Sequence, residues 1–263
     1  MAITTANQLV TAIAGGQTVY TDKASMVAIV GTYQSLWTAG IIPAAGGTPA
    51  ASPGAVPTNA TVGAIPYLNP SAASVGYLAG CDLAGANAIT LTIYDRLVHT
   101  SGMFGNETAV QTVNSTALTR YTSGVGVQCW LEVYTALGVT SASVSVEYTN
   151  QSGVSGRGGT ATIVASATAG TSFPVALAQG DTGVQSVQSC QLSISTGTAG
   201  NFGITLGYDL TTIGLMNHLV EQTNDYAQIG LPVIQPNACL AYRVLPTLTS
   251  TGALLANFLF VQG

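Results

Sequence analysis

Few residue types in this chain could do chemistry, and they are widely spaced. The two histidines, His99 and His218, each lack the second histidine four residues away that a helical metal site requires. Asp95 lies four residues before His99 and could form an acid–base pair with it, but no nucleophile or third group accompanies them. We therefore interpret His99 as an ordinary loop histidine near the end of a strand.

Two glycine-rich motifs resemble catalytic or phosphate-binding sequences only superficially. Ser155 lies between Gly153 and Gly156, but the spacing of a nucleophile elbow fails at Arg157, and the context predicts a hairpin. The glycine cluster at 156–159 is followed by neither a lysine nor a helix. It therefore predicts no phosphate site.

The cysteines and the turn aspartate also indicate structure rather than chemistry. The four cysteines are Cys81, Cys129, Cys190 and Cys239. They are too far apart for a zinc or redox motif, so we expect buried, reduced thiols, with Cys81 the most accessible because glycines flank it. A disulfide between distant strands is an alternative that the sequence leaves open. Asp181 lies in a turn before Gly183, and a single carboxylate is too few to bind calcium. We predict no catalytic residue, no metal, no cofactor and no enzyme.

Charged residues are unusually rare. They make up 6% of the 263 residues, against about 25% in ordinary soluble domains. The basic residues are Lys23, Arg96, Arg120, Arg157 and Arg243. With a net charge of −5, nucleic acid is not expected as a partner. A surface this poor in charge lacks the usual protection against association, so we expect much of it to be covered by copies of the chain or by other proteins. The arginines would then pair at subunit contacts, or be solvated if the chain is a monomer.

The elements that position these residues are predicted to be strands. Between 127 and 166 the period of two in apolar residues predicts three consecutive antiparallel strands with one wet and one dry face. The middle strand buries Ala142, Val144, Val146 and Tyr148, and a turn at 150–153 precedes the third strand. Further strands are predicted at 88–94, 108–118, 171–177, 184–195, 202–210, 240–245 and 254–262. No run of about 20 apolar residues predicts a membrane span.

This spacing predicts a mainly β fold, an antiparallel β-sandwich resembling a jelly roll, over residues 88–263. An irregular insertion at 213–237 holds one expected helical turn around 216–222. The last strand carries Phe258 and Phe260 and is apolar on both faces, so we expect it to be buried in the core and under a partner.

The first 87 residues differ from the rest. In the helical segment 1–42, Thr5 caps a helix that ends at Gly15, and Asp22 caps a second helix over 23–38. The second helix would present one apolar stripe to this chain or to a neighbour. Six prolines make 43–87 an extended Pro/Gly/Ala-rich arm that could cross a neighbouring subunit.

Several runs resemble virion structural proteins of tailed bacteriophages. They are YDRL at 94–97, QCWLEVY at 128–134, YTNQSGVSGR at 148–157 and GDTGV at 180–184. The resemblance covers roughly residues 85–210. It implies a particle component, assembled in the host cytoplasm, without an active site to transfer.

The resulting hypothesis is a decoration or capsid-associated protein of the phage head that stabilises the particle by many weak contacts with itself and other virion proteins. The candidate interface residues are Met26, Val30, Tyr33, Trp37, Arg96, Arg157, Phe258 and Phe260. One alternative is a tail or baseplate protein. Another is an adhesin that binds host glycans by stacking on Trp130, Tyr134 and Tyr121, although such aromatics are more often cross-strand pairs.

Overall fold

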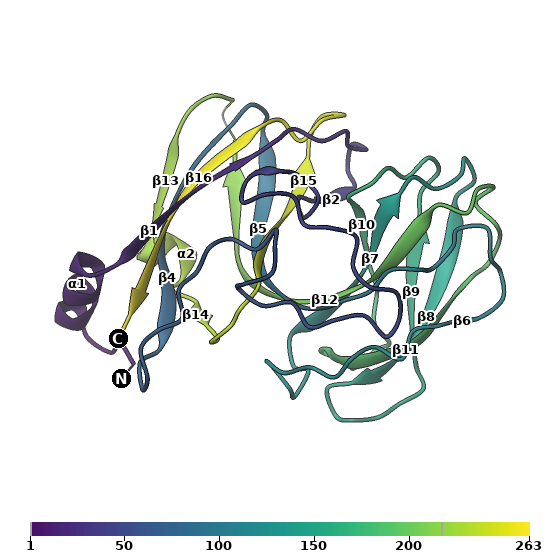
Figure 1. Cartoon of the computed structure of the whole chain (residues 1–263), viewed down its shortest axis with the longest axis horizontal. Helices are drawn as coiled ribbons and strands as arrows, with labels where there is room; N and C mark the ends of the chain where they lie inside the picture. Colours follow the sequence, from purple (N-terminus) through teal and green to yellow (C-terminus); the bar gives the residue numbers. More distant parts are fainter. Residues whose placement is uncertain (1, 217) are drawn as a thin grey trace.

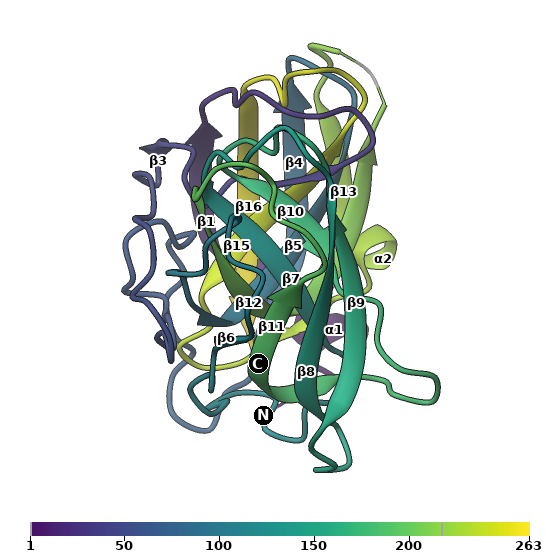
Figure 2. The same ribbon diagram turned by 90° about the vertical axis from the view of Figure 1, so that its right-hand side faces the viewer.

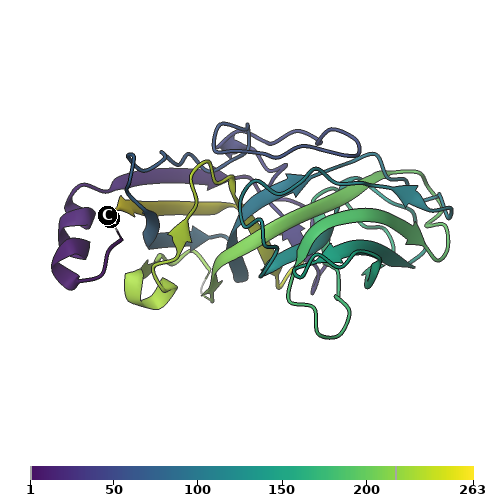
Figure 3. The same cartoon turned by 90° about the horizontal axis from the view of Figure 1, so that it is seen from below.

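Strands dominate the chain in the computed structural model, which describes residues 2–216 and 218–263. A closed barrel lies at the centre, a six-stranded sheet lies on one side of it and a four-stranded sheet on the other (Figure 1). The molecule is elongated along this direction, and helix α1 forms the tip beyond the six-stranded sheet (Figure 3). The predicted mainly β, antiparallel fold is confirmed.

The barrel closes because β10 pairs with both β2 and β7. In order around the barrel its strands are β10 (Thr171–Pro174), β2 (Tyr33–Ser35), β15 (Leu240–Pro246), β5 (Ile89–His99), β12 (Asn201–Leu215) and β7 (Val127–Thr135). Every neighbouring pair is antiparallel. Closure leaves the barrel without a free edge.

The six-stranded sheet packs its inner face on one side of the barrel. Its strands are β13 (Gln222–Asp225), β4 (Gly76–Gly85), β16 (Leu254–Gln262), β1 (Gln17–Lys23) and β3 (Ile41–Ile42), with β14 (Val233–Ile234) also paired to β4. Alternate residues of β16, including Phe258 and Phe260, point into a core shared with Leu91 and Tyr242 of the barrel. Period-two burial of large apolar side chains therefore holds these layers together.

The four-stranded sheet packs on the opposite side of the barrel, where it faces the viewer in Figure 2. Its strands are β6 (Gln111–Thr112), β11 (Val184–Leu192), β8 (Ala142–Asn150) and β9 (Arg157–Ile163). Val144 and Val146 of β8 join Leu131 of β7 and Phe202 of β12 in a second core. The alternation predicted for β8 and its hairpin with β9 are confirmed.

Two short helices complete the described fold. Helix α1 (Ala6–Ala14) begins at Thr5 in a capping box with Gln8 and ends at Gly15, as predicted. Helix α2 (Tyr226–Ile229) is capped by Asp225. The helical turn expected around 216–222 is wrong in place, because β12 continues to Leu215 and the turn comes at α2; residue 217 itself lies outside the described residues.

The second predicted helix, at 23–38, is wrong. This segment contains the end of β1, irregular chain and β2, and Gly31 has a positive φ of 75° that interrupts any helix. The preceding residues Val19, Thr21 and Lys23 alternate inward along β1, which pairs with β16. The apolar spacing at 26–37 matches that of a helix, but pairing with distant strands determines the structure of this segment.

The pairing expected between the first two strands of 127–166 is also wrong. Strand β7 pairs with β10 and β12 inside the barrel, whereas β8 belongs to the four-stranded sheet. Both faces of β7 are therefore buried. Strand β6, within the predicted strand 108–118, pairs with β11.

The proline-rich segment 43–87 packs on its own chain. Ten of its residues, Gly76–Gly85, form β4, and Ala55 pairs with His99 in an isolated bridge. Ile65 is buried, and its N–H donates to the carbonyl of Leu240. Strands β1 to β4 thus hydrogen-bond into sheets formed with residues 88–263. Residues 43–87 therefore do not form an extended arm that is free to cross a neighbouring subunit.

Candidate functional site

The interior of the barrel is filled by charged and aromatic side chains. Strands β5, β7 and β15 point alternate residues inward, and the main ones are Tyr94, Arg96, Trp130, Glu132, Tyr134 and Arg243. These strands are not all neighbours around the barrel, so their side chains meet across its interior. All six are buried, which separates the cluster from solvent.

Arg96 is the centre of this cluster. Its Nη1 lies 2.7 Å from Oε2 of Glu132. Its Nε donates to Nδ1 of His99 at 2.9 Å and its Nη2 to the hydroxyl of Tyr134 at 2.9 Å. Oε2 of Glu132 also accepts from the hydroxyl of Thr205 at 2.5 Å. Charge-assisted hydrogen bonds therefore offset much of the cost of burying Arg96, whose exposed fraction is 0%.

Arg243 is held between two aromatic rings. Its guanidinium carbon lies 4.3 Å from the ring centre of Tyr94 and 3.6 Å from that of Trp130. Its Nη1 lies 3.3 Å from Oδ1 of Asp209, whose other oxygen accepts from the amide of Gln128 at 2.9 Å. Two arginines and two carboxylates thus balance the charge in and at the rim of the barrel.

Asp95 points away from this cluster and binds Arg120. The pair is bidentate, with Nε to Oδ2 at 2.8 Å and Nη2 to Oδ1 at 2.9 Å. Oδ1 also accepts from the backbone N–H of Cys239. Burial raises the pKa of Asp95, and the hydrogen bonds and charge of Arg120 oppose this rise. Since Nη2 of Arg120 also donates to the carbonyl of Pro57, the pair fixes the proline-rich segment to the barrel.

His99 forms no acid–base pair with Asp95. Its Nδ1 accepts from Arg96, so the ring is neutral with its proton on Nε2. Burial, with the nearby charge of Arg96, lowers the pKa of His99 to about 2. The buried side chains can therefore fix the positions of the barrel strands, but they present no group to a substrate.

The outer surface carries almost no positive charge. Lys23 is buried, donates to the carbonyl of Ala39 at 2.9 Å, and has its pKa lowered to about 8 by burial. Arg157 is partly exposed and pairs with Asp181 at 2.8 Å. Hydrogen bonds from Arg157 and Tyr148 lower the pKa of Asp181 to about 2. Both expectations for the arginines are wrong, because all four form ion pairs inside this chain.

What remains outside is neutral or acidic. The carboxylates that form no ion pair among the described residues are Asp22, Asp82, Glu107, Glu147, Glu221 and Asp225. The outer face of the four-stranded sheet carries mainly hydroxyls and amides, from Ser143, Ser145, Thr160, Thr162 and Gln191. Large apolar side chains are exposed at many points, among them Val30, Phe104, Val139 and Met216.

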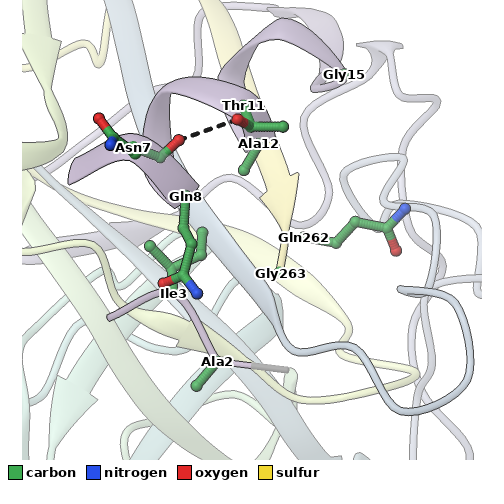
Figure 4. Close-up of a pocket in the computed structure, with 9 residues that line it drawn as sticks. All are labelled: Ala2, Ile3, Asn7, Gln8, Thr11, Ala12, Gly15, Gln262 and Gly263. Carbon is green, nitrogen blue, oxygen red and sulfur yellow. Dashed lines mark hydrogen bonds between the residues drawn. The ribbon is translucent and has the colours of Figure 1, made fainter. Parts of the chain in front are cut away.

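A cavity of about 490 Å³ lies beside helix α1 (Figure 4). It is lined by uncharged residues from the helix and from both ends of the described chain, including Ile3, Asn7, Thr11 and Gln262. The helix buries only Leu9. None of the described residues that line this cavity has a titratable side chain.

The predicted interface residues fall into two groups. Trp37, Arg96, Phe258 and Phe260 are buried inside the chain, where no partner can reach them in this fold. Met26 packs partly on the core, and the ring of Tyr33 meets Trp130 at 5.0 Å. Val30, with an exposed fraction of 55%, and Arg157 remain at the surface. The alternating hydroxyls of β8 were predicted to lie on the wet face, and Ser143 and Ser145 are exposed there.

The aromatic residues proposed for glycan binding do not form a platform. Trp130 and Tyr134 are buried in the barrel, and Tyr121 stacks on Tyr208 with ring centres 3.9 Å apart.

All four cysteines are free and buried as predicted, but Cys81 is as inaccessible as the others. Across residues 2–216 and 218–263, no three His, Cys, Asp or Glu side chains are placed to hold a metal ion. None of the helices in this part of the chain could span a membrane.

Comparisons with known proteins give no family. No family model matches the chain, and no curated protein matches it. Among solved structures it is similar to the VP2 subviral particle of infectious bursal disease virus, at 12% identity and a TM-score of 0.24, over 94% of this chain and 81% of that one. The same virus's Gx strain gives 10% identity and a TM-score of 0.21, over 94% and 79%. No function is taken from superpositions this poor.

Proposed function

We propose that this chain is a non-enzymatic structural component of a bacteriophage particle, most simply a protein that decorates or reinforces the head. The observation that carries the proposal is the distribution of charge. The basic side chains are buried or paired within the chain, and the outer surface is left with hydroxyls, amides and scattered apolar groups.

Such a surface is suited to permanent contacts. Neutral hydroxyls and amides cost less to desolvate than charges do, and they can be paired across an interface. A free monomer would instead gain solubility from mixed surface charge, which this protein lacks. Weak contacts of this kind become strong when many copies bind a symmetric lattice. The resemblance of residues 85–210 to tailed-phage virion proteins supports the same proposal.

Quantitative mass spectrometry of purified particles tests the proposal. The chain should copurify with the particle at a fixed ratio close to that of the shell subunit. A fixed ratio of only a few copies per particle would replace the head assignment with a tail or baseplate position. Absence from purified particles of the phage that encodes the chain would contradict the proposal altogether.

A further inference from the structure

The outer face of the six-stranded sheet contains a trough that runs along β4. The floor consists of Gly80, which has no side chain, and of Asp82 and Ala84, whose short side chains point outward from that strand. Leu255 and Leu259 of β16 form one wall. The other wall consists of residues 221–226 of β13 and its flanks. Two adjoining hollows of about 380 and 220 Å³ occupy the trough.

Apolar groups line this trough without being covered by the chain. Tyr20, Leu255 and Tyr226 have exposed fractions of 46%, 41% and 43%. Tyr20, Asn257 and Asp82 lie in register across three neighbouring strands, so they share the outer face. Large exposed side chains beside a groove are typical of a binding surface.

The charges of this face have one sign. Asp82 lies on the floor, Glu221 at one end and Asp225 at the other, and Asp22 is on the adjacent part of β1. The side-chain carboxylates of Asp22, Asp82 and Glu221 form no ion pair within the described residues. Asp225 caps α2 and forms no ion pair with any residue that the structure describes. Four of the six carboxylates outside ion pairs therefore gather at this one face.

A second copy of the chain has no free lysine or arginine to offer to this face. Lys23, Arg96, Arg120 and Arg243 are buried, and Arg157 is held by Asp181. The occupant that complements this face must therefore be a different molecule with exposed positive charge. The three floor residues are spaced two apart along a strand, so the trough is roughly 13 Å long, the length of about four extended residues.

We propose that the outer face of the six-stranded sheet binds an extended segment of a different protein, one that carries lysine or arginine at alternate positions. Its cationic groups pair with Asp82 and the carboxylates at either end, while its intervening side chains pack on Leu255 and Leu259. This proposal is independent of the particle role and would hold for the chain in any assembly.

Fluorescence anisotropy with a labelled peptide of five Lys-Val repeats, capped at both ends, tests the proposal. The purified full chain should bind this peptide saturably and should not bind the Glu-Val counterpart. The variant Asp82→Asn with Glu221→Gln should weaken binding about tenfold or more, because close charge pairs are lost. The control Glu107→Gln with Glu147→Gln loses the same charge elsewhere and should change binding less than about twofold.

A third variant separates the trough from the general field of the protein. A Cβ at Gly80 would meet its nearest neighbour, Cβ of Leu259, at 3.5 Å, so Gly80→Val fits the strand while filling the trough. It should weaken peptide binding with no change in charge, and its unchanged circular dichroism would show that the sheet is intact. Failure of the wild type to bind the Lys-Val peptide would overturn the proposal. Equal losses in both double variants would do so as well.

Discussion

The interior of the barrel and the outer face of the four-stranded sheet differ most in the kind of polar group they carry. The interior holds Arg96, Glu132 and Arg243, and each forms an ion pair. The outer face of β8 and β9 presents serine and threonine hydroxyls, and Glu147 is its one carboxylate. Most proteins place charge the other way round.

The interior of the barrel provides specificity for one fold, and the outer surface provides the capacity for association. Buried ion pairs contribute little net stability against an apolar core, but a broken pair is costly, so they penalise any other arrangement of the barrel strands. A neutral exterior lowers the cost of covering the protein. The few charged residues therefore specify the fold from inside the barrel. The outer surface, which is left largely without them, costs less to cover with a partner.

The largest expected effect comes from breaking the interior pair. Glu132→Gln keeps the shape of the side chain but leaves Arg96 buried without its counter-charge, and we expect a loss of about 3–5 kcal/mol in the free energy of unfolding. Urea unfolding at neutral pH measures it. The matched substitution Glu147→Gln on the outer face should stay within about 0.5 kcal/mol. Similar losses in both variants would remove the contrast between the two regions.

A smaller loss is expected where the barrel holds the proline-rich segment. Arg120→Met removes the partner of Asp95 and the donor to Pro57, at about 3 kcal/mol. The cost stays below that of Glu132→Gln because Asp95, whose pKa burial already raises, can take up a proton. Hydrogen exchange should also become faster at Ala55. Arg157→Met, which breaks a partly exposed pair, should cost less than either of these substitutions, and a larger loss there would contradict this ranking.

Acid should destabilise the protein through His99. The folded ring stays neutral, since its pKa is lowered to about 2, whereas the unfolded ring binds a proton below its ordinary value of about 6.5. The unfolded state therefore gains the extra proton, and stability falls by up to about 1.4 kcal/mol per pH unit from 6.5 downward. Urea titrations of wild type and His99→Gln at several pH values isolate this slope. His218→Gln, at the exposed histidine, is the control and should keep the wild-type slope.

The smallest effect on stability is expected on the outer face. Ser145→Lys with Thr162→Lys adds two charges to exposed strand positions and should change the unfolding free energy by no more than about 0.5 kcal/mol. The variant should nevertheless associate less with itself, because like charges now face each other across a contact. Sedimentation velocity compares it with the neutral control Ser145→Gln with Thr162→Gln. Identical association in the two variants would show that this face makes no contact between copies.

Local patterns in the sequence predicted local structure well. The Thr5 cap and the Gly15 stop predicted α1, and the alternation of Val144 and Val146 predicted β8 and its dry face. In each case neighbouring residues carry the whole signal, through capping or through period two.

Features set by distant residues were not predictable in this way. In β7 the polar residues of the predicted wet face are withdrawn from solvent because the barrel closes around them: Glu132 is buried and Gln128 is half-buried. Their partners, Asp209 and Arg96, come from other strands, so the residue spacing within β7 could not predict them. The apolar spacing from Met26 to Trp37 suggested a helix for the same reason: burial there depends on strands far away in the chain.

We predict that the neutral exterior is a contact surface in the assembled state. Hydroxyl-radical footprinting of the chain, free and within purified particles, measures this directly. We predict that Phe104 and Met216, both exposed in the free chain, lose most of their oxidation in the particle, while buried Trp130 stays unreactive in both states. Equal oxidation of Phe104 and Met216 in the free and particle-bound chain would contradict the claim.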